Sequence, residues 1–521
     1  MLIPRLNIPD SRYRWFALGT TLIGGFMSIL DTSIVNIAVP KMMAAFSVGT
    51  DDAQWILTAY MLTMGVLQPA TGYLCNTFGA RRMYLLSLFT FVVGSALCGM
   101  AWSNDSMIAF RVFQAIGGGL IIPITMSIVY QEFPPAERNI ALGIWGMSVA
   151  MAPAVGPTLS GYLVDYWDWR YIFTINIPVG ILGYVVASLV LRETTLIKNT
   201  KFDYAGFLTS STGLFCLLLA LSKGVDKGWD SFYIVSLLYA AFALLTLFIL
   251  IELSTDNPML DLTLFKDWNF TVGSIFVFIT TTILMGSMFM VPLFLENLLG
   301  HTAMQSGMLL LPAALVGGFL MPVAAKLADR FGAKPFVILG ALFALGGTFP
   351  LMYIDLDTSS QYVVFVQILR GVFIGLAMMT CTVLSMNNVP MAKVSQASAI
   401  NNTLRQVSGS FGIAVLSTVL QNRQIFHTAQ IAAAMNNTSP AARTMIQYGE
   451  KLFAHAGSTA SVAHQQSLVL LNSLVQRQAI IFTYDDAFWV LGVFAILGVV
   501  AALLLKQTKA GHGGQTVVAM E

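Results

Sequence analysis

Apolar stretches separated by short polar connections follow one another along almost the whole chain. Most of them reach about 20 residues, the length at which a helix crosses the hydrocarbon core of a bilayer. Because backbone in lipid must satisfy its own hydrogen bonds, the pattern predicts an all-α membrane protein. We expect fourteen helices, at 14–39, 53–75, 82–102, 105–131, 139–163, 169–192, 202–221, 231–253, 269–294, 305–327, 333–354, 360–385, 396–420 and 484–507.

The pattern also repeats. The connection GYLCNTFGARR at 72–82 shares the letters FGA and nearby basic residues with KLADRFGAKP at 326–335. An arginine inside an apolar run follows each connection, at Arg111 and Arg370. The matching order of connection and buried arginine predicts two copies of a six-helix unit, in 1–200 and 269–521. Two inserted helices and a linker lie between them in 201–268. Repeated halves are typical of secondary transporters, which bind substrate where the halves meet.

Composition narrows the class of protein. The 521 residues are 56% hydrophobic and only 10% charged, whereas soluble domains contain about 25% charged residues. A net charge of +2 argues against nucleic acid as a partner. The four cysteines fall in or beside apolar runs and lack the spacing of a metal site. No nucleotide-binding loop or catalytic triad is recognisable, so we expect neither an enzyme nor a bound cofactor or metal.

Basic residues indicate how the chain crosses the membrane. Lys and Arg gather in alternate connections, which the positive-inside rule assigns to the cytoplasm. This pattern places both termini inside and the long polar segment 421–483 outside. Such a long loop is usually functional or disordered. Its tracts at 428–435, 441–454 and 462–478 could form short amphipathic helices.

Asp31 is the only acid that we expect deep within a span. A carboxylate at that depth is costly, which makes it a functional residue by default. Low-dielectric surroundings favour the protonated form, so Asp31 could exchange a proton. The alternative is a structural acid that is hydrogen-bonded to Thr32, Asn36 or a neighbouring helix.

Arg111 is a buried cation that must find a partner inside the bundle. It could hold a nearby acid deprotonated until a conformational change separates the two, or it could form a static ion pair. Arg370 and Arg405 have no deep acid in their own half, so we expect structural roles for them.

Six segments resemble one family: LDTSIVNIAVP (30–40), GYLCNTFGARR (72–82), RVFQAIGGGL (111–120), GMSVAMAPAVGPTLSGYL (146–163), WRYIFTINIPVG (169–180) and NNTLRQVSGSFGIAV (401–415). The chain is similar to the fourteen-helix drug:proton antiporter branch of the major facilitator superfamily, the group of the EmrB and QacA efflux pumps. The resemblance implies a bacterial inner-membrane antiporter that exports lipophilic or amphipathic compounds by alternating access and uses the proton gradient rather than a cofactor.

The resemblance also assigns roles to individual residues. It implies proton coupling for Asp31 and Arg111, and a first-helix motif that includes Thr32 and Asn36. The antiporter motif comprises Gly146, Pro153, Gly156, Pro157 and Gly161. The gating loops comprise Gly72, Asn76, Gly79, Arg81, Arg82, Asp329, Arg330, Gly332 and Lys334. The family's loop acid is present as Asp329 but replaced by Asn76 in the first copy. We therefore expect a weaker inner latch on that side, because charge-assisted hydrogen bonds are the stronger ones.

The substrate cavity should be apolar with few polar groups. Our candidates for its lining are Gln68, Phe278, Met285, Met288, Phe289, Met378 and Arg405. Plain packing or contact with lipid is the alternative for the Met and Phe residues among them.

The resemblance also bears on partners. We expect a lipophilic small molecule and the lipid bilayer. The EmrB-like subset works with a periplasmic adaptor and an outer-membrane channel, which segment 421–483 could contact unless it is only a mobile lid. Other readings are an exporter of an endogenous lipid or metabolite, an uptake symporter, and a non-transporting accessory or sensor protein.

Overall fold

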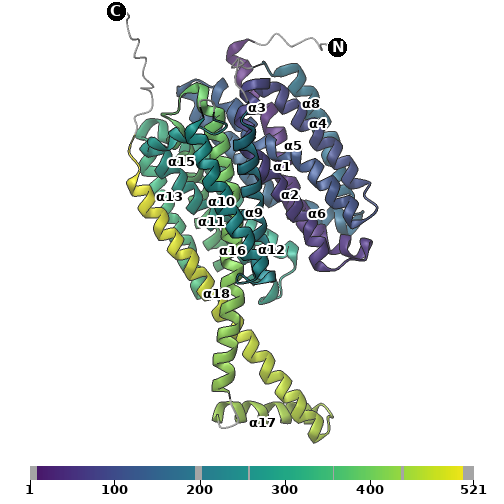
Figure 1. Ribbon diagram of the computed structural model, residues 1–521. Coiled ribbons are helices and arrows are strands. Elements are labelled where there is room, and N and C mark those ends of the chain that lie inside the picture. Colours follow the sequence, from purple (N-terminus) through teal and green to yellow (C-terminus); the bar gives the residue numbers. More distant parts are fainter. Residues whose placement is uncertain (1–8, 194–201, 256–257, 356, 436–438, 508–521) are drawn as a thin grey trace, which may run out of the picture.

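The computed structural model describes residues 9–193, 202–255, 258–355, 357–435 and 439–507. Helices account for nearly all of this part of the chain (Figure 1). The longer elements are α1 (Asp10–Phe46), α2 (Thr50–Leu67), α3 (Thr71–Phe78), α4 (Ala80–Gly99), α5 (Asn104–Glu132), α6 (Pro135–Tyr166), α8 (Asn176–Val190), α9 (Tyr204–Lys227), α10 (Phe232–Ser254), α11 (Trp268–Asn297), α12 (Ala303–Phe331), α13 (Ala333–Thr348), α14 (Ser360–Phe373), α15 (Met379–Met386), α16 (Val394–Ala434), α17 (Pro440–His455) and α18 (Ala460–Leu504). The expected all-α membrane bundle is confirmed.

Twelve helices of the described residues are long and apolar enough to cross a membrane, compared with the fourteen that we expected. The two expected spans outside this set are 53–75 and 396–420. Each forms helix within the bundle, as α2 to α3 and as α16, but both are more polar. The first of these also contains a short 3-10 segment, η1 (Gln68–Ala70), at Pro69, which lacks a backbone N–H.

The two FGA connections have one physical cause. Gly79 is the single residue between α3 and α4, and Gly332 is the single residue between α12 and α13. Both have positive φ, +93° and +88°, a conformation that suits glycine because it has no Cβ. The repeated motif is therefore a tight helix–glycine–helix turn. We call the end of the bundle that carries both turns the inner end.

Segment 421–483 is not a loop, as we expected, but mainly helix. The tract at 441–454 corresponds to the short amphipathic helix α17. The other two tracts are continuous with membrane helices, because α16 runs on to Ala434 and α18 begins at Ala460. The two extensions project beyond the bundle and α17 lies across their far ends (Figure 1). We call residues 421–483 the arm.

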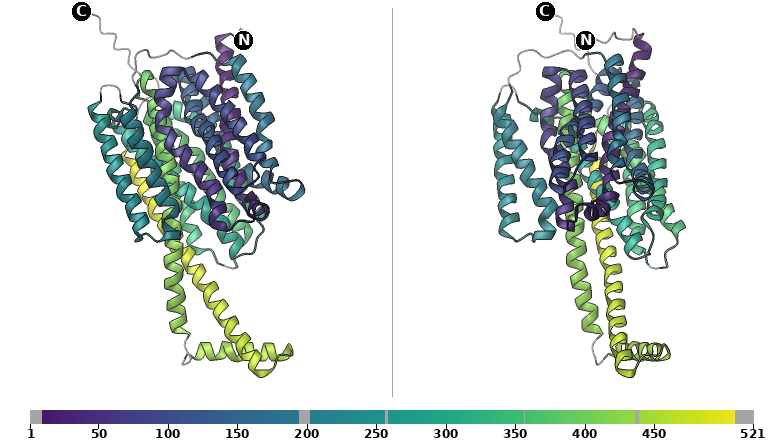
Figure 2. Two further views of the ribbon diagram at one scale, coloured as in Figure 1. Left: turned by 45° about the vertical axis from the view of Figure 1, so that its right-hand side comes forward. Right: turned by 90° about the vertical axis from the view of Figure 1, so that its right-hand side faces the viewer.

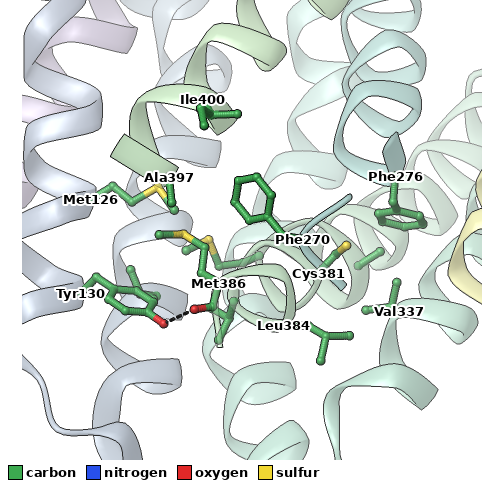
Figure 3. Close-up of a cluster of buried hydrophobic side chains, with 14 of the residues drawn as sticks. Met126, Tyr130, Phe270, Phe276, Val337, Cys381, Leu384, Met386, Ala397 and Ile400 are labelled. Carbon is green, nitrogen blue, oxygen red and sulfur yellow. Dashed lines mark hydrogen bonds between the residues drawn. The ribbon is translucent and has the colours of Figure 1, made fainter. Parts of the chain in front are cut away.

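The halves meet through a buried layer at the inner end. Met126 and Tyr130 of α5 lie against Met386 and Ala397 from the second half (Figure 3). The Tyr130 hydroxyl donates to the Met386 carbonyl over 2.7 Å, and Ser398 donates to the Pro123 carbonyl over 3.1 Å. The hydrogen bonds between halves that involve described residues lie in the inner part or the middle of the bundle. The structure is thus closed at its inner end.

The helices α9 and α10 form a pair on one flank of the bundle (Figure 2). From this flank α9 contacts α2 of the first half and α16 of the second. The Ser211 hydroxyl donates to the Val66 carbonyl over 3.2 Å. Trp229, in the turn after α9, donates its indole N–H to Thr418 Oγ1 over 2.8 Å. The inserted pair therefore covers the seam between α2 and α16.

Candidate functional site: a buried acid–arginine centre

Asp31 lies in the middle of α1 and is fully buried. Side chains from neighbouring helices supply the hydrogen-bond partners of its carboxylate. Arg111 Nη1 on α5 is 2.6 Å from Asp31 Oδ2. The other oxygen, Oδ1, accepts hydrogen bonds from the side-chain amides of Gln114 at 2.9 Å and Asn176 at 3.0 Å. The carboxylate thus joins α1, α5 and α8. Thr32, which we considered as a partner of Asp31, donates its hydroxyl to the Ile29 carbonyl instead.

Arg111 is equally enclosed, with 1% of its surface exposed. Its Nη1 also donates to Gln114 Oε1 at 2.6 Å, and its Nε donates to the Ile56 carbonyl at 3.4 Å. The Tyr60 ring lies below the guanidinium, with its centroid 3.8 Å from Cζ. A cation in lipid needs such compensation, and a stacked aromatic ring stabilises it further. The structure thus brings Asp31 and Arg111 together as a hydrogen-bonded ion pair.

Three residues of this centre were not predicted from the sequence: Gln114, Asn176 and Tyr60. Gln114 also donates to Ser95 Oγ over 2.7 Å, which extends the network to α4. A signal for Gln114 was present, since it follows Arg111 by three residues and shares its helical face. Asn176 is likewise a polar residue within an expected span. Nothing in the sequence shows that Tyr60 reaches Arg111, because they lie on different helices.

The chemistry of this centre depends on the charge of Asp31. As a carboxylate, Asp31 balances the charge of Arg111 and accepts three hydrogen bonds from described residues. Removal of that negative charge would leave a buried cation without a counter-charge, which is strongly unfavourable.

The antiporter motif lies on α6, between α1 and the second half. Toward α1, Ser33 Oγ donates to the Pro153 carbonyl over 3.2 Å, and a Cβ at Gly156 would lie 2.4 Å from Ser33 Oγ. Toward α12, a Cβ at Gly146 would lie 3.0 Å from Met321 Sδ. The motif therefore forms a close-packed seam on two sides. A Cβ at Gly161 would meet nothing within 4 Å.

One further residue of the antiporter motif and one of the first-helix motif complete the set. Pro157 lies within the helical span of α6, but its side chain is outside the described residues, and the expected bend there stays a prediction. Asn36 is exposed on α1 and makes no described contact with Asp31.

The first FGA connection packs against the second half through glycine. A Cβ at Gly72 would lie 3.0 Å from the Gln396 Cα of α16. Asn76 is half-buried near the end of α3. Arg81 donates to the Ser188 carbonyl over 2.8 Å, and Arg82 lies 3.3 Å from Glu193. These two arginines therefore hold the connection to the first half.

The second FGA connection reaches across to the first half. Asp329 accepts a hydrogen bond from the Asn139 side chain of α6. Arg330 is exposed and Lys334 is half-buried, and neither forms an ion pair within the described part of the chain. The loop acid therefore joins the halves through an amide and not through a cation.

Four expected cavity residues lie where α11, α15 and α16 converge. Arg405 Nη2 donates to Thr382 Oγ1 over 2.7 Å, and Thr382 donates to the Met378 carbonyl over 2.9 Å. Phe278 stacks on Phe411, and Met285 contacts the backbone at Gly409.

The other three expected cavity residues lie elsewhere. Gln68 is buried in η1 of the first half. Phe289 packs into a cluster near the outer end of the second half, and Met288 is 38% exposed.

A helical bundle with repeated inner turns, and with a buried ion pair among its membrane helices, is typical of secondary transporters. The sequence profile of the Major Facilitator Superfamily matches residues 21–413, and this chain belongs to that superfamily. It is therefore a multi-pass membrane transporter and not an enzyme.

Similar proteins agree with this assignment. YhcA of Bacillus subtilis (strain 168), described as an uncharacterized MFS-type transporter, is 32% identical over 94% of this chain and 92% of its own length. The multidrug export protein EmrB of Escherichia coli (strain K12) is 28% identical over 94% of this chain and 95% of its own. The solved structure of the proton:xylose symporter XylE shares the fold with a TM-score of 0.61 at 14% identity, covering 96% of this chain and 98% of that one.

Proposed function

We propose that this chain is a proton-coupled antiporter that exports lipophilic or amphipathic compounds from bacterial cells. The observation that carries the proposal is the buried Asp31–Arg111 pair, because an ion pair at that depth is costly and can change state with a single proton. The similarity to EmrB supports export rather than uptake.

The coupling acts through α1 and α6. Protonation of Asp31 loosens its bonds to Arg111, Gln114 and Asn176 and frees α1 to move. Ser33 Oγ bonds the Pro153 carbonyl, and Ser160 Oγ bonds the Ile34 carbonyl over 2.7 Å, so α6 follows α1.

The movement of α6 then reaches the second half. On its other face, a Cβ at Gly143 would lie 2.9 Å from the Pro322 Cα of α12. A shift of α6 therefore changes the contact between the halves. Proton and substrate drive exchange only if each binds the two conformations differently.

The test is transport by the full chain in proteoliposomes with an imposed pH gradient. Lipophilic cations and neutral dyes serve as substrates for the wild type, for Asp31→Asn and for Asp168→Asn, which changes an exposed acid as a control. We expect Asp31→Asn to retain exchange at equilibrium but to lose gradient-driven accumulation. Gradient-driven accumulation by Asp31→Asn would exclude Asp31 as the coupling acid, and no gradient-driven transport by the wild type would exclude the antiporter.

We also propose that the chain resides in the inner membrane with both termini in the cytoplasm. The excess of Lys and Arg in the connections at the inner end supports this orientation. It places the arm outside the cell membrane, in the periplasm of a bacterium with two membranes.

The arm is the proposed contact for an adaptor protein and, through it, an outer-membrane channel. It exposes apolar side chains beyond the bundle, including Ile425 at 66%, Tyr448 at 69% and Val469 at 70%. Exposed apolar surface outside lipid is typical of an interaction site. Photocrosslinking in cells from position 469 should capture a single-anchor adaptor, whereas position 235 on α10 should not. Equal capture from both positions would refute this contact.

A further inference from the structure

An unpaired cation lies near the interface between the halves, apart from the Asp31 centre. Arg405 is half-buried on α16, and the one hydrogen bond of its guanidinium to a described residue goes to the neutral Thr382 hydroxyl. No carboxylate pairs with it among the described residues. A guanidinium has five N–H donors, and a desolvated one needs an anion to complete them.

Polar groups without partners surround this cation. Asn401 is fully buried one helical turn before Arg405, and neither its amide nitrogen nor its oxygen has a hydrogen-bond partner. On the facing stripe of α11, the hydroxyl groups of Ser274 and Thr281 are also buried without partners. A buried polar group without a partner is costly, so each of these groups requires an explanation.

The register of the two helices brings these groups to one place. The Ser408 carbonyl accepts from Thr282 at 3.3 Å, and the backbone at Gly412 packs on Thr282. On α11, Ser274 and Thr281 belong to the same stripe as Phe278 and Met285, since residues three and four apart share a helical face. By this register Arg405 is level with Phe278, with Ser274 one turn before that level and Thr281 one turn after it.

The cluster borders the first half. Asn402, next to Asn401, contacts Met126 of α5, with 4.0 Å between Nδ2 and Sδ. On the other side of the cluster, Met379 of α15 lies against Gly146 of α6. Since α16 packs on helices of both halves, Arg405 lies on a helix of the interface between them. A ligand at this place would touch the interface that alternating access opens and closes.

We propose that Arg405 and Asn401 bind the anionic head group, such as a carboxylate, of an amphipathic substrate. The planar guanidinium matches a carboxylate with two parallel hydrogen bonds. The Asn401 amide supplies further donors, and Phe278 with Met285 offers an apolar wall for the tail. Asp31 cannot serve a cationic ligand in this conformation because Arg111, Gln114 and Asn176 already occupy its oxygens.

This inference rests on the proposed export function but names the substrate as an anion. The test uses the full chain in nanodiscs and two probes of equal shape, naphthylacetate and its neutral amide, naphthylacetamide. Empty nanodiscs correct for partition into lipid. We expect the wild type to bind the carboxylate at least tenfold more tightly than the amide, the minimum expected for a charge-assisted contact.

Variants of Arg405 and Asn401 then test which side chains cause the preference for the carboxylate probe. Arg405→Gln should weaken naphthylacetate binding about tenfold to hundredfold and leave naphthylacetamide unchanged, because only the charged contact is lost. Arg405→Lys should retain part of the preference, since it keeps the charge without the planar fork. Asn401→Leu should weaken binding less, about fivefold, since the lost bond has a neutral donor. Arg477→Gln, which makes the same change at an exposed arginine of the arm, is the matched control and should bind as the wild type does.

The outcomes separate this inference from the proposed function. Equal binding of both probes by the wild type, or an unchanged preference in Arg405→Gln, overturns the anion site. If the anion site is overturned but proteoliposomes still accumulate neutral dyes under a pH gradient, the proposed antiporter function is retained. If the preference depends on Arg405 but no gradient drives transport, the site stands and the antiporter fails.

Discussion

Tyr130 joins the two halves by a single buried hydrogen bond, so its removal tests the inner closure directly. Tyr130→Phe deletes the hydroxyl that donates to the Met386 carbonyl over 2.7 Å (Figure 3). The ring remains, and with it the contact of Arg138, whose Cζ lies 4.1 Å from the ring centroid. The substitution therefore removes one bond between the halves and keeps the ring in place.

The expected magnitude follows from burial. Tyr130 and Met386 are both 1% exposed, and the Met386 carbonyl keeps a second donor, the Val389 backbone N–H at 3.0 Å, when the hydroxyl is removed. The variant therefore loses one buried hydrogen bond but leaves no carbonyl unsatisfied, a net cost of about 0.5–1.5 kcal/mol. The open inner end does not make this bond, so the cost falls on the closed state alone. The ratio of closed to open inner ends should therefore fall about twofold to tenfold.

Spin-label distances across the inner end measure this ratio. Labels at Phe78 and Phe331, which are 50% and 58% exposed, occupy the same place in the two repeats. Tyr84→Phe is the matched control, because Tyr84 also donates to a buried carbonyl, that of Thr20 at 2.9 Å, but within the first half. A shift to longer distances in Tyr130→Phe alone is expected. Equal shifts in both variants, or none in either, would refute the reasoning.

Three further predictions concern the inner turns and the packing. Asn76→Asp should raise the closed fraction in the same distance measurement, because a carboxylate strengthens its hydrogen bonds; an unchanged distribution would make Asn76 a tolerated replacement. Gly117→Ala should lower stability by about 1–3 kcal/mol, because its Cβ would lie 2.4 Å from the Ser87 carbonyl oxygen, whereas Gly161→Ala should unfold at the wild-type temperature. Burial would raise the pKa of Asp261, but its bond to Lys393 brings that pKa below the usual value. The Asp261–Lys393 pair therefore stabilises the fold at pH values above the unfolded-state pKa of Asp261, about 3.9. This stabilisation is lost as the pH falls through the lower folded-state pKa of Asp261. Asp261→Asn should lower the melting temperature at pH 7 and make little difference near pH 3; an equal loss at both would exclude the ion pair as its cause.

Much of the architecture follows from the sequence alone. Length and hydropathy determine that the chain forms membrane helices, since lipid leaves the backbone few other options. The repeated FGA letters locate two inner turns, because glycine readily adopts the positive φ that Gly79 and Gly332 require. Depth within a span likewise singles out Asp31 and Arg111, because a charged side chain in the membrane is costly and is usually functional.

The tertiary structure decides what these residues touch. Asn176 reaches Asp31 from 145 positions away in the chain, and hydropathy does not encode which faces of α1, α5 and α8 meet. The arm was misread as a loop because polar sequence ends a membrane span but does not end a helix, and α16 and α18 continue beyond the bundle. The unpaired state of Arg405 is also a tertiary property. A sequence shows that a cation is present, but only the packing of α11, α15 and α16 shows that no described acid comes near it.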